Sequence, residues 1–113
     1  VASGTTTAIG SVLYVSANDT VDEADKDDIS AAKVVGLART VVVGDGALTV
    51  DVQADGILVG ALAGATAGTR YYLSDAGALS SSPPSATGDY VLMIGIAANA
   101  TDIFVRIGDA ILL

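Results

Sequence analysis

The chain has 113 residues, of which 51% are hydrophobic and only 4% aromatic, and a net charge of −8, so we expect a single domain over residues 1–113. Its five Lys and Arg residues form no basic stripe, which argues against binding to nucleic acid or to an anionic membrane surface. The absence of Cys and His excludes disulfides, Ser-His-Asp or Cys-His catalytic arrangements, and zinc sites built on those residues.

Runs of β-branched residues, some alternating with polar ones and separated by glycine-bearing turns, predict an all-β fold. The segment "ISAAK" at residues 29–33 indicates a short helical turn, and the uncharged residues 1–8 form either an arm or a frayed end. The spacing suits a compact antiparallel barrel or sandwich. Strands are expected near residues 10–16, 34–43, 47–53, 56–62, 69–74, 90–97, 102–107 and 110–113.

The sequence repeats itself. The segment "GSVLYVS", which begins at Gly10, matches "GTRYYLS", which begins at Gly68. Two further pairs of matching segments follow in the same order. They relate residues 34–38 to 93–97 and residues 48–52 to 103–107. We interpret the chain as two copies of one β unit, about residues 8–60 and 66–113.

Two residue types recur at matching places in these halves. Gly36 and Gly95 each fall inside a predicted strand, which indicates a bulge, a sharp bend or a close approach of another backbone segment. Tyr14 and Tyr72 also match, and packing in the core or at its rim is the favoured role over ligand binding.

The two long connections differ in composition. The first is acidic, and carboxylate oxygens can bind Ca²⁺. However, the segment lacks the central glycine and the terminal glutamate of the EF-hand pattern and contains Lys26, so a solvated charged loop is favoured. The second contains Pro83 and Pro84, which predict a stiff, extended surface loop. The acidic residues are Asp19, Asp22, Glu23, Asp25, Asp27 and Asp28.

The sequence offers little for catalysis. Only Lys26 or Lys33 could serve as a base for a serine nucleophile, and both lie in or beside the acidic loop. No phosphate-binding loop is present, and no carboxylate pair is fixed at a separation that suits glycoside hydrolysis. We therefore expect no enzyme, and we assign no catalytic, cofactor-binding or metal-binding residue.

The second half of the chain contains a series of short patterned segments, Tyr71–Ser74, Ala76–Leu79, Ser80–Pro84, Val91–Ala97, Asp102–Ile107 and Ala110–Leu113. Through these segments, residues 67–113 resemble the C-terminal stretch of small β-rich structural proteins of tailed bacteriophages, namely head decoration (cement) proteins, head fibres and tail-fibre modules. Residues 1–60 resemble the same group through "VASG", "GSVLYVS" and "AAKVVGLA".

This resemblance implies a virion structural protein, most simply a decoration protein on the outer surface of the capsid. Its expected partners are the major capsid protein or other virion structural proteins. The apolar-rich, aromatic-poor composition leaves small apolar faces for a partner subunit to cover, which also favours a homo-oligomer; the resemblance favours a trimer. The alternatives are a receptor-binding tail-fibre module and a subunit of a self-assembling extracellular filament.

Overall fold

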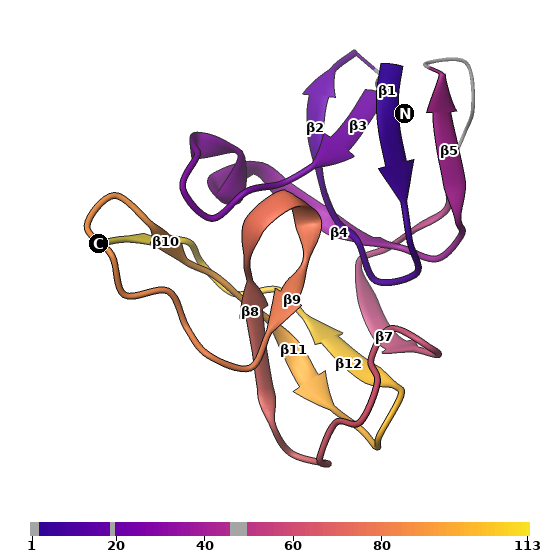
Figure 1. Cartoon of the computed structure of the whole chain (residues 1–113), viewed down its shortest axis with the longest axis vertical. Helices are drawn as coiled ribbons and strands as arrows, with labels where there is room; N and C mark the ends of the chain where they lie inside the picture. The colour runs from indigo at the N-terminus through magenta and orange to yellow at the C-terminus, as the bar shows by residue number, and fades with distance from the viewer. Residues whose placement is uncertain (1–2, 19, 46–49) are drawn as a thin grey trace.

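The computed structural model of the chain describes residues 3–18, 20–45 and 50–113. It is an all-β structure in which every strand pairing is antiparallel (Figure 1). The two helical segments are 3₁₀ turns, η1 (Ile29–Lys33) and η2 (Asp75–Gly77). The strands are β1 (Ser3–Thr7), β2 (Val12–Ala17), β3 (Thr20–Glu23), β4 (Val34–Ala38), β5 (Val42–Asp45), β6 (Val52–Gln53), β7 (Asp55–Leu58), β8 (Arg70–Leu73), β9 (Leu79–Ser80), β10 (Tyr90–Val91), β11 (Met93–Ala97), β12 (Ile103–Arg106) and β13 (Ile111–Leu112).

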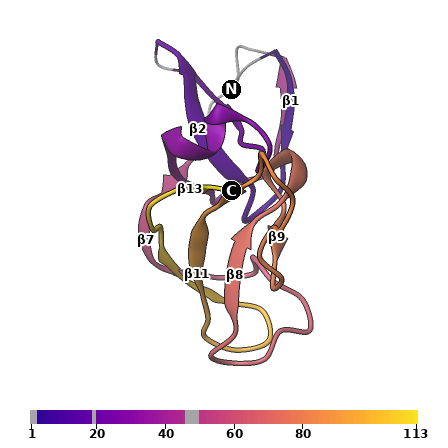
Figure 2. The same ribbon diagram turned by 90° about the vertical axis from the view of Figure 1, so that its left-hand side faces the viewer.

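The strands form two main sheets and two ribbons. The first sheet has four strands in the order β3-β2-β4-β6, and the second has five in the order β7-β12-β11-β8-β9. Two-stranded ribbons join β1 to β5 and β10 to β13. Figure 1 shows the first sheet above the second, and Figure 2 shows the second sheet running from β7 past β11 and β8 to β9. The barrel alternative is wrong, because both sheets formed by the described residues end at open edges.

The predicted strands agree with the structure where the sequence pattern is strong. The segments predicted at 69–74, 102–107 and 110–113 contain β8, β12 and β13, the segment predicted at 10–16 covers β2 except for its last residue, Ala17, and "ISAAK" forms η1. The single strand predicted over 34–43 is wrong, because a bend at Arg39–Thr40 separates β4 from β5. The strand predicted over 90–97 is likewise split into β10 and β11.

The remaining strand predictions fit less well. The strand predicted over 56–62 ends at Leu58, and of the one predicted over 47–53 only β6 is seen, residues 46–49 lying outside the described residues. Residues 3–7, suggested as an arm or a frayed end, form β1 and pair with β5 of the same chain. β3 and β9 are not predicted by the sequence, because all of their residues are half-buried and no alternation of apolar and polar residues marks them.

The two sheets share a pairing pattern. The order β3-β2-β4-β6 corresponds to β9-β8-β11-β12, strand for strand. Leu13 faces Gly36 in the first sheet and Tyr71 faces Gly95 in the second, and in both sheets a register shift follows at the next residue. Each shift is a β-bulge that places one extra residue directly before the glycine.

Corresponding turns lead into β2 and β8. Gly10, with a φ of +93°, donates its N–H to the Ala38 carbonyl oxygen at 2.9 Å. Gly68, with a φ of +88°, donates in the same way to Ala97 at 2.8 Å. A positive φ is disfavoured for residues with a Cβ, so glycine is the natural residue at both turns.

Gly36 and Gly95 lie where the neighbouring strand comes closest. A Cβ on Gly36 would meet the backbone oxygen of Gln53, and one on Gly95 would meet the backbone oxygen of Phe104. Of the predicted alternatives of a bulge, a sharp bend or a close backbone approach, the structure shows a bulge directly before each glycine and a close backbone approach at it.

The pairing relates the third segments differently from the sequence match. Ala38 pairs with Val52 in the first sheet, and Ala97 pairs with Ile103 in the second. By this pairing the position equivalent to Ile103 is Val52, whereas the sequence match assigns Leu48 to it. β7 also departs from the predicted division, since it falls within residues 8–60 but pairs with β12 in the second sheet. The two sheets are therefore not separated at residue 60.

One hydrophobic core joins both sheets. Tyr14, Tyr71 and Tyr90 pack partly against it, whereas Tyr72, the predicted counterpart of Tyr14, is half-buried outside this set. Among the described residues no helix is long and apolar enough to cross a membrane. The core residues are Val12, Ala24, Ala31, Leu37, Leu58, Leu73, Leu92, Ile94, Ile103 and Val105.

Candidate functional site

The acidic segment runs from the edge strand β3 to the start of η1. Asp22 and Glu23 are half-buried in β3, and Asp25 is half-buried in the turn that follows. Asp27 and Asp28 are exposed, and Asp28 caps η1 by accepting the Ser30 N–H at 3.2 Å. Asp19 lies outside the described residues.

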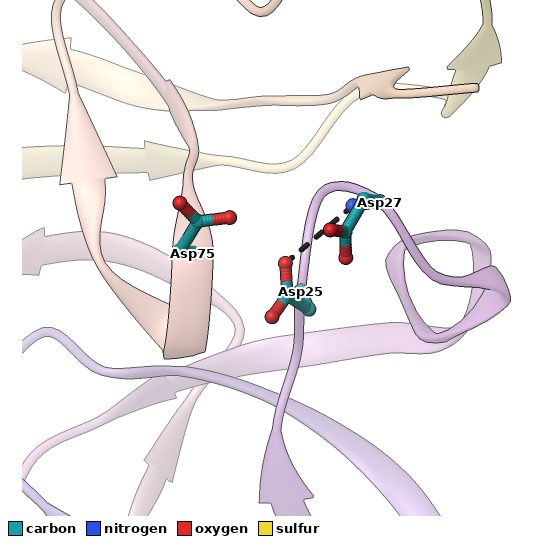
Figure 3. Close-up of side chains that lie close together, drawn as sticks. All are labelled: Asp25, Asp27 and Asp75. Carbon is teal, nitrogen blue, oxygen red and sulfur yellow. Dashed lines mark hydrogen bonds between the residues drawn. The ribbon is translucent and has the colours of Figure 1, made fainter.

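The fold brings a carboxylate from η2 to this segment. Oxygens of Asp25, Asp27 and Asp75 all lie within 4.8 Å of one another (Figure 3). Asp25 accepts backbone N–H groups from Asp27 at 3.5 Å and from Ala76 at 3.4 Å. The sequence does not reveal Asp75 as a member of this cluster, because no local pattern relates η2 to a turn so distant along the chain.

The close packing of these carboxyl groups shifts the pKa values of two neighbours, Asp25 and Asp27, in opposite directions. Burial alone would raise the pKa of Asp25, but hydrogen bonds from Asp27 and Ala76 outweigh it and hold that pKa below its ordinary value. The pKa of Asp27 is raised, because its carboxyl shares a hydrogen bond with Asp25 and stands beside that negative charge. Asp25 therefore keeps its charge to lower pH than Asp27 does.

Lys26 ties the acidic segment to the second half of the chain. Its Nζ lies 2.9 Å from the Asp89 carboxylate, which is only 9% exposed, and 3.9 Å from that of Asp75. Its backbone N–H donates to Ser74 at 3.2 Å, and its carbonyl oxygen accepts the Tyr90 N–H at 2.6 Å. Both ion pairs formed by the described residues therefore involve this one lysine.

The contacts of Lys26 determine how well it could act as a general base. The hydrogen bond to Asp89 and the negative charge of that carboxylate raise the pKa of Lys26. A lysine that acts as a general base needs a lowered pKa, so its surroundings favour the opposite protonation state. The geometry suits Lys26 for linking two parts of the fold.

The three-carboxylate cluster is the arrangement nearest to a cation site. Ca²⁺ takes six to eight oxygen ligands, and the Lys26 ammonium already lies near Asp75. Both carboxylate oxygens of Asp25 also accept hydrogen bonds from backbone N–H groups. The contacts seen here hold the β3–η1 turn against η2.

An open groove of about 430 Å³ runs between the two halves. Its polar groups include Ser11, Glu23 and Tyr71, and most of the remaining lining is alanine and glycine. Burial raises the pKa of Glu23, a hydrogen bond with Ser11 lowers it, and the charge of Asp22 raises it further, so that the net pKa lies above the ordinary value. The groove presents one partly desolvated carboxyl group.

The loop with Pro83 and Pro84 borders a second open groove. No strand is formed at residues 81–89, and Pro83 is exposed while Pro84 is half-buried. Lys26 and Asp89 also line this groove. The proline loop therefore lies beside the ion pair that joins the two halves.

Large apolar side chains are exposed over much of the surface. They gather at the C-terminal end, where Ile111, Leu112 and Leu113 are 61%, 60% and 43% exposed, and on the second sheet, where Ile57 and Phe104 are directly paired. The others are Ile9, Val15, Ile29, Val35, Val41, Val52 and Val59.

No protein-family model, no curated protein sequence and no solved structure matches the chain. The surfaces of the chain and its sequence pattern are therefore the observations that bear on its function.

Proposed function

We propose that this protein is a non-catalytic structural subunit of a virus particle, a capsid decoration protein that binds the outer surface of the shell. It acts as a homo-oligomer, with a trimer favoured, and its partner is the major capsid protein or another virion structural protein. Support comes from the phage-like pattern of residues 67–113 and from the exposed apolar side chains of an all-β surface.

The C-terminal strand gives the strongest structural support for this proposal. β13 pairs with β10 alone among the described strands, and its two residues and the following Leu113 are three consecutive exposed aliphatic residues. Full burial of one such side chain contributes about 1.5–3 kcal/mol, so covering the exposed parts of all three contributes on the order of 3–5 kcal/mol before association costs. Each copy adds a modest contact, and an oligomer multiplies it through avidity.

We also propose that the halves are two copies of one β unit. The matching strand order, the bulges before Gly36 and Gly95, and the equivalent turns at Gly10 and Gly68 support this relationship. A duplicated unit would give each subunit two similar frames on which different loops are carried. The acidic segment and the proline loop are such differing loops.

Immunogold electron microscopy of particles from the source, with an antibody to this chain, tests the proposed location. Label over heads supports decoration. Label confined to tails or fibres would replace it with the receptor-binding alternative, and label on free filaments alone would support the extracellular filament.

A binding assay with shells that lack the protein tests the contact itself. Leu112→Ser is expected to weaken binding severalfold, because it removes exposed apolar area without changing the backbone pairing of β13. Val15→Thr, at a comparably exposed strand position, is the matched control and should bind as the wild type does. Equal binding by both variants would refute a role for β13.

A further inference from the structure

The outer face of the second sheet carries an apolar row. Ile57 on β7, Phe104 on β12 and Ile96 on β11 are successive cross-strand partners. Directly paired residues in an antiparallel sheet point to the same face, and the next residues, Leu58, Ile103 and Ala97, are buried on the other side. Phe104, the only phenylalanine of the chain, is 45% exposed, and Ile57 is 49% exposed.

Two arginines flank this row. Arg70 on β8 is the cross-strand partner of Ile96 and so extends the row. Arg106 follows Phe104 by two residues on β12 and therefore shares its face, opposite Asp55 on β7. Both arginines are exposed, and neither belongs to the ion pairs formed within the described residues, which both involve Lys26. A chain of net charge −8 thus carries two of its five cations on one apolar face.

The start of η1 combines an exposed apolar side chain with negative rather than positive groups. Ile29 is 56% exposed, although the next two residues of η1, Ser30 and Ala31, are buried. The exposed carboxylates of Asp27 and Asp28 precede it directly. This edge therefore joins an apolar side chain to two negative groups. The sheet face joins an apolar row to Arg70 at one end and to Arg106 beside Phe104, where Asp55 and Asp102 are the carboxylates on the same face.

We propose that a second copy of this chain docks its Asp27–Asp28–Ile29 edge on the outer face of the second sheet. Ile29 packs on the row around Phe104, and the carboxylates lie beside Arg70 and Arg106. Burial of the apolar side chains stabilises the contact, and the opposite charges select its orientation. The inference rests on the oligomer of the proposed function and names the surfaces that form it.

The proposed contact joins two different surfaces, so it is heterologous. Figure 1 shows η1 apart from β7 and β12, above and to the left of them, which lets one subunit use both surfaces at once. Such a contact passes from subunit to subunit and closes into a ring where the rotation permits, or continues as a filament where it does not. A ring is the form that suits a decoration oligomer.

Sedimentation equilibrium of the purified chain over a range of concentration and salt tests the contact. Arg70→Glu and Asp28→Lys should each weaken association about tenfold, because each places like charges together in the interface. The double variant carrying both changes should recover most of the wild-type affinity. Arg39→Glu, an exposed arginine outside the proposed surfaces, is the matched control for the change in net charge and should associate as the wild type does.

Phe104→Ser tests the apolar part and should weaken association at least about tenfold. Circular dichroism of each variant verifies that the fold is retained. A wild-type chain that is monomeric at every concentration, or a double variant no better than the worse single variant, overturns the inference. Binding to shells is measured separately, so an associating chain that binds no shell would refute the decoration function and leave this contact in place.

Discussion

Substituting Gly95 by alanine should destabilise the protein strongly, although the change adds only one methyl group. The new Cβ would overlap the backbone oxygen of Phe104 and also lie 3.0 Å from the Cγ1 of Ile103. Because a backbone carbonyl cannot rotate away, β12 would have to move and loosen its pairing with β11. Overpacking of this kind costs about 1–3 kcal/mol and occasionally more, while the lower chain entropy of unfolded alanine returns only about 0.4–1 kcal/mol.

The net loss expected for Gly95→Ala is therefore about 2 kcal/mol, a large share of the roughly 5–15 kcal/mol that stabilises a domain. Urea unfolding followed by circular dichroism gives this difference, and Gly36→Ala should behave alike, since its Cβ would meet Val52 Cγ1 at 2.6 Å. Gly108→Ala is the control, because its nearest contact is an ordinary 3.7 Å to the Met93 oxygen. If Gly95→Ala lies within 0.5 kcal/mol of Gly108→Ala, as surface changes do, the close-approach argument is refuted.

Three further variants test the core and the contacts between the halves, each by its urea midpoint. Ile94→Ala should cost about 2–5 kcal/mol, because this fully buried side chain leaves a cavity in the shared core; a smaller loss than that of an exposed isoleucine would contradict the packing. Lys26→Met should lower the midpoint at pH 7 and Lys33→Met should not, since only Lys26 pairs with the nearly buried Asp89. Glu23→Gln should raise the midpoint at pH 7 and lose this advantage toward pH 4, because the raised pKa of Glu23 stabilises the fold at low pH and this contribution disappears as pH rises through that pKa. An advantage that grows as pH falls would contradict burial as the cause.

The sequence indicates the strands whose residues alternate clearly between buried and exposed positions, and it misses β3 and β9, which each form one edge of a sheet. β12 alternates buried Ile103 and Val105 with exposed Phe104 and Arg106, so its period of two is visible in the letters. β3 has no such contrast, because all four of its residues are half-buried at a sheet edge. Edge strands of this kind are defined by backbone pairing, which leaves little trace in side-chain pattern.

The acidic segment shows a second limit on what can be predicted from the sequence. Its charges are plain in the sequence, but their partners are not, since Asp75 and Asp89 come from the other half of the chain. Lys26 looks like one cation within a row of acids, yet its closest carboxylate is Asp89. Long-range pairing decides which charges are neutralised, and a single sequence carries no local record of it.

The position of β7 connects the proposed duplication with the proposed contact. β7 follows β6 in the chain, but it leaves the first sheet and pairs with β12, which gives the second sheet its fifth strand. The outer row therefore combines Ile57 from the first half with Phe104 from the second. The buried side of the same pairing sets Leu58 against Ile103 in the common core. A single β unit would possess neither this core nor this face, so the surface proposed for a second copy exists only where two units share a strand.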